Sequence, residues 1–108
     1  MTREEWGTME WLADGATQTG LGLSLARMTV LPGKTSPAHR HPNCHEVIHI
    51  LSGVIDQRLG ETWTEHKSGE TITALSGTVH QTRCTSPVPA ILMIAYSDGS
   101  RIYEEVTT

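Results

Sequence analysis

The sequence predicts an all-β fold in the form of a small β-barrel, and three observations favour it. Short runs rich in β-branched and aliphatic residues recur at intervals of about ten residues. Gly, Pro, Asn or Asp residues separate these runs, and signals for helices are nearly absent. About eight such strands can close into one sheet whose interior is filled by side chains or holds one small ligand. Closure also removes the exposed strand edges that promote aggregation.

The first half of the chain contains four expected strands, and each ends at a turn. The strands cover residues 22–31, 38–41, 45–51 and 54–59. The turns that follow them are Pro32-Gly33, Pro42-Asn43, Ser52-Gly53 and Gly60-Glu61. Such pairs favour chain reversal because Pro presets φ, whereas Asn and Gly tolerate unusual backbone angles.

The second half repeats this arrangement with four more expected strands. They cover residues 62–66, 71–74, 81–85 and 90–96. The breaks after them are Ser68-Gly69, Ser76-Gly77, the pair Pro87 and Pro89, and Asp98-Gly99. No repeat, low-complexity segment or linker divides the sequence, so one closed sheet accounts for all eight strands.

A chain of 108 residues matches a single domain with one hydrophobic core. We expect residues 1–20 to form an N-terminal arm or edge strand and residues 21–108 to form the barrel. Trp6 and Trp11 lie outside the clear strands, so we expect these large apolar side chains to pack across a dimer contact or onto the barrel wall. A homodimer is therefore expected.

Charge and composition exclude several classes of partner. The chain carries 12 acidic and 8 basic residues, a net charge of −4, and no basic run that could follow phosphates, so nucleic-acid binding is not expected. No apolar run approaches the roughly 20 residues that span a bilayer, and the first residues lack the apolar core of a signal peptide. We therefore expect a cytoplasmic protein with no membrane partner. Its two cysteines are too few for a disulfide framework.

Four of the six histidines fall between residues 39 and 49, and this cluster predicts a metal site. His39 and His41 are two residues apart, so on a strand both project from the same face. The turn at Pro42-Asn43 then reverses the chain and can bring Glu46 beside them, where its carboxylate offsets part of the charge of a dication. His80 would complete the set from another strand.

The same residues fit a known family pattern. Gly33, His39, His41, Glu46 and Gly53 resemble the first cupin motif at every fixed position. Gly69, Gly77 and His80 resemble the second motif, with Leu75 in place of its Pro and Cys84 in place of its Asn. The resemblance covers about residues 33–84 and implies a double-stranded β-helix, similar to a jelly roll. It also implies that His39, His41, Glu46 and His80 bind one metal ion.

The expected cofactor is one divalent transition metal, with Fe(II) first and Mn(II), Ni(II), Zn(II), Cu(II) or Co(II) as alternatives. Four protein ligands leave one or two positions open for water or a small, anionic organic substrate. By analogy with other cupins, we expect a metal-dependent dioxygenase. The alternatives are a lyase, isomerase or decarboxylase in which the metal is a Lewis acid, and a cupin that only binds a ligand or metal.

Residues beyond the ligand set are less constrained by spacing. We name His66, Gln57 and Tyr96 as candidate catalytic residues, because a general base is needed and Gln57 shares a strand face with two apolar residues. Further candidate bases are Gln81, Arg58 and the thiols of Cys44 and Cys84. We expect both cysteines to be small buried residues, and we expect His45 and His49 to point away from the face that carries Glu46.

Overall fold

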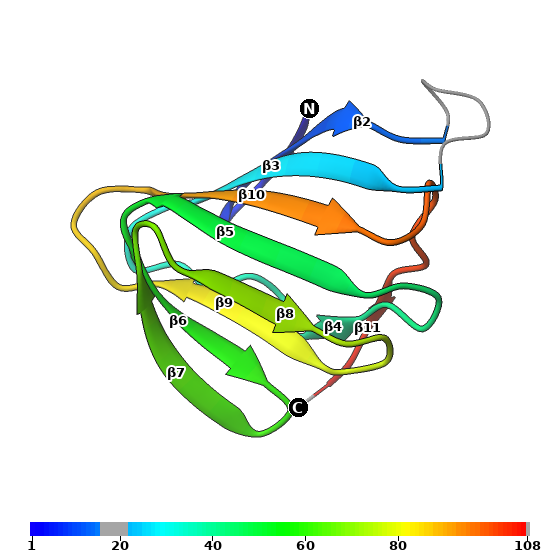
Figure 1. The fold of residues 1–108 in the computed structure, drawn as a ribbon. Coiled ribbons are helices and arrows are strands. Elements are labelled where there is room, and N and C mark those ends of the chain that lie inside the picture. The colour runs from blue at the N-terminus through cyan, green and yellow to red at the C-terminus, as the bar shows by residue number, and fades with distance from the viewer. Residues whose placement is uncertain (16–21, 108) are drawn as a thin grey trace.

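In the computed structural model, which describes residues 1–15 and 22–107, the described strands form two antiparallel sheets. The six-stranded sheet has the order β1 (Thr2–Glu4), β2 (Gly7–Ala13), β3 (Ser24–Val30), β10 (Ala90–Tyr96), β5 (Glu46–Ser52), β8 (Thr71–Ala74). The five-stranded sheet has the order β11 (Glu104–Glu105), β4 (His39–Arg40), β9 (His80–Cys84), β6 (Val54–Leu59), β7 (Thr62–Lys67). Figure 1 shows the two sheets as layers.

The core lies between the sheets because strand residues alternate between the two faces. On β10, every second residue from Ala90 to Tyr96 is buried, and on β3 the same holds from Ser24 to Val30. The five-stranded sheet contributes Ile55 and Cys84 to this core. Burial of these apolar side chains, at about 25 cal/mol per Å² removed from water, is the main force that holds the two sheets together.

The all-β fold is confirmed, and all eight expected strands are present with ends shifted by a few residues. The expected single closed sheet is replaced by two sheets. The strands β7 and β8 follow one another in sequence, yet β7 pairs with β6 and β8 pairs with β5. The turn between them therefore carries the chain from one sheet to the other, and buried side chains occupy the space that separates the sheets.

The N-terminal segment, expected as an arm or a single edge strand, contains two described strands, β1 and β2, and the short strand β11 was not expected. The first two place the N-terminal segment at one edge of the six-stranded sheet, where β2 pairs with β3. The part of the expected N-terminal arm from residue 16 to residue 20 lies outside the described residues. The described residues contain no helix that could cross a membrane.

One glycine controls the corner between β5 and β6. Gly53 has a φ of +84°, a conformation that side chains with a Cβ rarely adopt. A Cβ at this position would lie 2.9 Å from the Cα of Ala90 and 3.0 Å from the carbonyl oxygen of Pro89. Glycine therefore allows the chain to cross between the sheets in close contact with the start of β10.

Candidate metal centre

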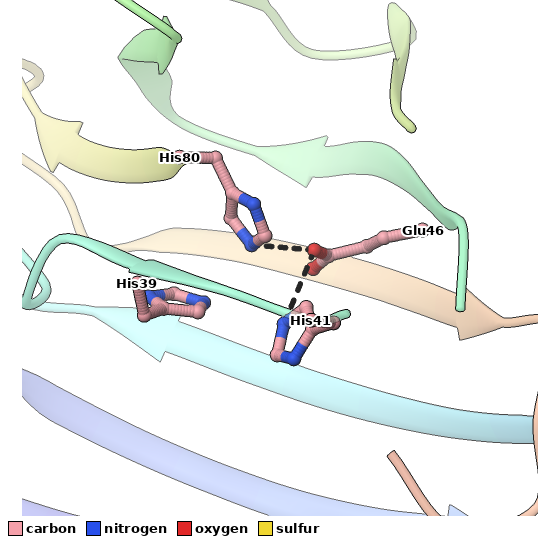
Figure 2. Close-up of side chains that lie close together, drawn as sticks. All are labelled: His39, His41, Glu46 and His80. Atoms are coloured by element: carbon pink, nitrogen blue, oxygen red, sulfur yellow. Dashed lines mark ion pairs between the residues drawn. The ribbon is translucent and has the colours of Figure 1, made fainter. Parts of the chain in front are cut away.

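The structure brings the four predicted ligands together at one end of the space between the sheets. His39 lies on β4 opposite His80, the first residue of the neighbouring strand β9. His41 follows β4 directly, and Glu46 begins β5 in the other sheet after the turn at residues 42–43. The three imidazoles and the carboxylate therefore point toward a common centre from both sheets (Figure 2).

The distances between the ligand atoms fit a single ion. One ligand atom from each of the four residues lies within 4.8 Å of all the others. Nε2 of His80 lies 2.6 Å from Oε2 of Glu46, and Nε2 of His41 lies 3.5 Å from the same oxygen (Figure 2). Atoms bound at about 2.0–2.2 Å to one metal lie at comparable separations from each other.

Backbone carbonyl groups set the orientation of all three imidazoles. Nδ1 of His39 donates to the carbonyl oxygen of Pro37 at 2.7 Å, and Nδ1 of His80 donates to that of Thr78 at 3.1 Å. Nδ1 of His41 donates to the carbonyl oxygen of Ile102 at 2.9 Å. Because each Nδ1 carries the proton, each Nε2 keeps a lone pair, which is the tautomer that binds metal.

The buried polar atoms of this cluster lack hydrogen-bond partners. Nε2 of His41, Nε2 of His80 and Oε2 of Glu46 are inaccessible to solvent, and none of them satisfies hydrogen-bond geometry with a described residue. Leaving such atoms unsatisfied costs about 1–3 kcal/mol each. A divalent cation at the centre would satisfy all three, so the donor set fits a transition metal that accepts mixed nitrogen and oxygen ligands.

Electrostatics divide the three histidines into two kinds. Burial, assisted by the charge of His80, lowers the pKa of His39 to about 3, and burial also lowers the pKa of His41. Burial alone would lower the pKa of His80 too, but contact with Glu46 outweighs it and raises that pKa. The surrounding histidines keep the pKa of Glu46 below its ordinary value despite its burial. In the metal-free protein, any proton in the cluster therefore resides mainly on His80.

A cavity of about 250 Å³ opens beside the cluster. His39, Glu46 and His80 line it on one side, so open coordination positions on an ion held there would face the cavity. Its other walls come from the N-terminal strands, from β3, β9 and β10, from the segment just before β4, and from the segment near β11. The residues that form these other walls are Thr2, Glu4, Trp6, Met9, Trp11, Met28, Ser36, Pro37, Thr82, Tyr96, Arg101, Tyr103 and Glu105.

The three candidate catalytic residues take different places. Tyr96 lines the cavity, is 2% exposed and pairs across the sheet with Glu46. Gln57 is buried, and its Oε1 accepts a hydrogen bond of 2.6 Å from the hydroxyl of Thr82, a residue on the cavity wall. His66 is half-buried, lies outside the cavity lining and pairs with Glu70 at 3.1 Å. Their catalytic roles stay predictions.

The other candidate bases lie away from the cavity lining. Nη1 of Arg58 donates to Oε1 of Gln81 at 3.2 Å, and neither residue lines the cavity. Cys44 and Cys84 are free, buried thiols, as expected. His45 and His49 also lie outside the cluster: the exposed His45 accepts a hydrogen bond from the amide of Ser76, and the half-buried His49 contacts Thr71.

Sequence reasoning missed most of the cavity walls, including Arg101 and Tyr103. Both follow the last expected strand, where no spacing links them to the ligand motif. The ring of Tyr103 stacks on His39 with centroids 4.8 Å apart. Ile102, which lies between Arg101 and Tyr103 in the sequence, orients His41 through its carbonyl oxygen. Trp6 and Trp11, expected on a barrel wall or a dimer contact, pack against the core and line the cavity.

Comparison with known proteins places this geometry in a family context. Residues 26–96 match a family model described as "Cupin domain". Germin-like protein 1-1 of Oryza sativa subsp. japonica is 32% identical over 84 residues, which cover 71% of this chain and 38% of the germin-like protein. The chain thus spans well under half the length of this relative.

Two solved structures share the fold at low sequence identity. An oxalate decarboxylase of Lactobacillus farciminis in a formate complex superposes with a TM-score of 0.89 at 14% identity, over 97% of this chain and 32% of that one. An oxalate oxidase in complex with the substrate analogue glycolate superposes with a TM-score of 0.86 at 20% identity, over 97% of this chain and 57% of that one. At these identities the likeness concerns the fold alone.

Proposed function

The chain belongs to the Cupin domain family, and on that basis we propose that it is a metal-dependent enzyme acting on a small organic acid. The observation that carries the proposal is the convergence of three imidazoles and one carboxylate, with ligand atoms within 4.8 Å of each other, beside a 250 Å³ cavity that His39, Glu46 and His80 line. A structural metal site is closed by its protein ligands, whereas this one faces a space large enough for a small molecule.

His39, His41, Glu46 and His80 would hold the ion, and the three neutral imidazoles and single carboxylate would leave it a net charge near +1. The donor set accepts Fe(II), Mn(II), Ni(II), Co(II), Cu(II) or Zn(II), and affinity order alone does not select one of them. When bound, the metal supplies Lewis-acid stabilisation of negative charge or, if it is redox-active, binding of O2. A positive centre in a partly enclosed cavity favours an anionic substrate.

We propose first a reaction without O2, in which a bond next to a carboxylate breaks. Tyr96 supports this reaction because burial and the neighbouring Glu46 raise the pKa of its phenol well above 10, so that it stays protonated at the cavity wall. In a decarboxylation the carbon–carbon bond breaks, CO2 leaves and the electron pair remains on the substrate carbon. That carbon would take the phenolic proton of Tyr96, which water then replaces. The two structural neighbours include a decarboxylase, in agreement with this chemistry.

A dioxygenase is the second candidate. The four residues would hold a metal that prefers six ligands with positions left for a substrate and O2. For this reaction the four metal ligands with Fe(II) bound would be enough, and no side chain would have to donate a proton. A cupin that binds a ligand without turnover is the remaining alternative.

Elemental analysis of the purified protein, followed by assays on a panel of keto-, hydroxy- and dicarboxylic acids, tests the proposal. Release of CO2 under anaerobic conditions supports the first reaction, and consumption of O2 that depends on substrate and Fe(II) supports the second. Tyr96→Phe should retain metal and lose at least about tenfold in anaerobic turnover, because only the phenolic proton is removed. Tight binding of these acids without any turnover would contradict both enzymatic proposals.

A further inference from the structure

Arg101 occupies an unusual position in the cavity that contains the metal cluster. It lies in the segment between β10 and β11 and lines the same cavity as His39, Glu46 and His80. Its guanidinium carbon lies 5.1 Å from the ring centroid of Trp11, 5.4 Å from that of Tyr96 and 5.0 Å from that of Tyr103. Three aromatic rings from three parts of the chain therefore surround one cation.

The guanidinium has no acidic partner among the residues that the structure describes. Its five N–H groups donate no hydrogen bond there, and no carboxylate lies within ion-pair distance. The nearest acidic residues along the chain have other partners. Asp98 accepts a hydrogen bond of 2.8 Å from the amide of Ser100, Glu104 pairs with Arg40 at 2.9 Å, and Glu105 accepts a hydrogen bond of 3.0 Å from Tyr103. Contact with aromatic faces stabilises the charge of an arginine without using its N–H donors. The donors remain available to a ligand.

Asn43 fixes the backbone on both sides of Arg101. Its side-chain NH2 donates to the carbonyl oxygen of Ser100 at 3.0 Å, and its side-chain oxygen accepts from the amide of Ile102 at 2.8 Å. Asn43 belongs to the turn that joins His41 to Glu46. The loop that carries two of the proposed ligands thus also positions the arginine.

The ring of Tyr96 connects Arg101 to the metal cluster. The guanidinium carbon lies 5.4 Å from the centroid of this ring, and the centroid of the His41 imidazole lies 5.2 Å from it. The arginine and an ion in the cluster would act as two positive centres in one cavity.

We propose that Arg101 binds a carboxylate of the substrate while the other end of the substrate lies at the metal cluster, so that the cavity selects small acids with two anionic groups. This inference rests on the proposed function, because it specifies the substrate class of the same site. Arginine suits the role since its planar fork binds a carboxylate through two parallel hydrogen bonds. Glu4 and Glu105 also line the cavity and disfavour acids that carry more negative charge than the two positive centres can balance.

The test measures binding by calorimetry, with the protein reconstituted with Mn(II). The probes are three dicarboxylates, malonate, succinate and glutarate, and three monocarboxylates of matching length, propionate, butyrate and valerate. Arg101→Gln removes the charge, and Arg101→Lys keeps the charge without the fork. Arg27→Gln is the matched control, because Arg27 is exposed, pairs with Glu10 on another part of the sheet and does not line the cavity.

We expect Arg101→Gln to weaken binding of the best dicarboxylate about 10–100-fold and to change monocarboxylate binding by less than about threefold. Arg101→Lys should lie between Arg101→Gln and the unaltered protein, and Arg27→Gln should bind like the latter. Mn(II) content should be equal in all four proteins. Equal dicarboxylate binding with and without Arg101, or an equal loss for both kinds of acid, would overturn the proposal.

A second measurement separates this proposal from the proposed function. In metal-free protein, the fluorescence of Trp11 beside Arg101 should respond to dicarboxylates, and the response should be lost in Arg101→Gln. If the protein prefers diacids in an Arg101-dependent way and yet turns over none of them, that result would contradict the proposed enzyme and support carboxylate binding by Arg101. Turnover of monoacids that is unaffected by Arg101→Gln would support the proposed enzyme and contradict the proposed role of Arg101.

Discussion

Replacing His80 by Ala removes one of the four proposed ligands and should abolish most metal affinity. Four-ligand zinc sites in peptides bind with apparent free energies of about 10–16 kcal/mol, so one ligand contributes about 2.5–4 kcal/mol if the four share it equally. At about 1.4 kcal/mol for each factor of ten, the dissociation constant should rise about 60- to 700-fold. The structure supports an equal share for His80, since its Nε2 is buried, lacks a hydrogen bond and lies 2.6 Å from Glu46.

Thermal unfolding with and without metal measures this loss. Metal at 100 times its dissociation constant stabilises the folded protein by about 2.7 kcal/mol. For a chain of 108 residues that stabilisation raises the melting temperature by about 10 °C. In His80→Ala the same metal concentration is close to or below the new dissociation constant, and the rise should shrink to about 3 °C or less.

His49→Ala is the matched control because it also removes one imidazole, from the same strand that carries Glu46 but outside the cluster. It should keep the full rise in melting temperature. Without metal, His80→Ala should itself be less stable by about 3 kcal/mol, since Glu46 loses its nearest partner at a site where it is 3% exposed. Full metal content together with a full metal-dependent rise in His80→Ala would refute the assignment of His80 as a ligand.

Three further predictions follow from the same contacts. At pH 6.5, His80 should release more than about half a proton on metal binding because its pKa is raised above 6.5, and His39 almost none because its pKa is about 3. His41, whose pKa is also lowered, should release less than about half a proton, so the total stays below the roughly 1.5 protons of three unperturbed imidazoles; calorimetry in buffers of different ionisation enthalpy measures this number. Gly53→Ala should lower the free energy of unfolding in urea by about 2–4 kcal/mol, because φ is +84° and the new Cβ would meet the Ala90 backbone at 2.9 Å. Gly60→Ala, at a position with φ +64° and open space around it, should lower it by about 1–2 kcal/mol. Equal losses would contradict the close approach of Gly53 to Ala90. Ile50→Ala should cost about 2–5 kcal/mol because its side chain is fully buried, and Leu51→Ala, at a position 47% exposed, should change stability by about 0.5 kcal/mol or less; similar losses at the two positions would contradict the face assignment of β5.

Much of the fold could be predicted because strand alternation and turn residues are local properties of the sequence. The eight expected strands have enough β-branched residues, and strong enough flanking turns, to be identified without tertiary information. The strands β1 and β11 have three and two residues, and every one of them is exposed. Their pairing depends on a neighbouring edge, so no alternation marks them.

The convergence of His39, His41 and Glu46 could be predicted because a strand and a tight turn determine it within eight residues. The walls of the cavity could not. Arg101 reaches the cavity through the Asn43 bonds and the three surrounding rings, all of which are tertiary contacts. The homodimer, the location in the cell and the identity of the metal stay predictions, since each depends on molecules other than this chain.

The bond from His41 to the carbonyl of Ile102 also constrains the order in which the protein can mature. Residue 102 follows all four proposed ligands in the sequence, so during synthesis on the ribosome the ligands emerge before the group that orients one of them. High-affinity metallation should therefore wait until the segment around residue 102 has docked against the turn at Asn43. Nascent chains stalled before this segment has emerged would then hold metal more weakly than chains in which it has docked, which delays loading until the orienting carbonyl is in place.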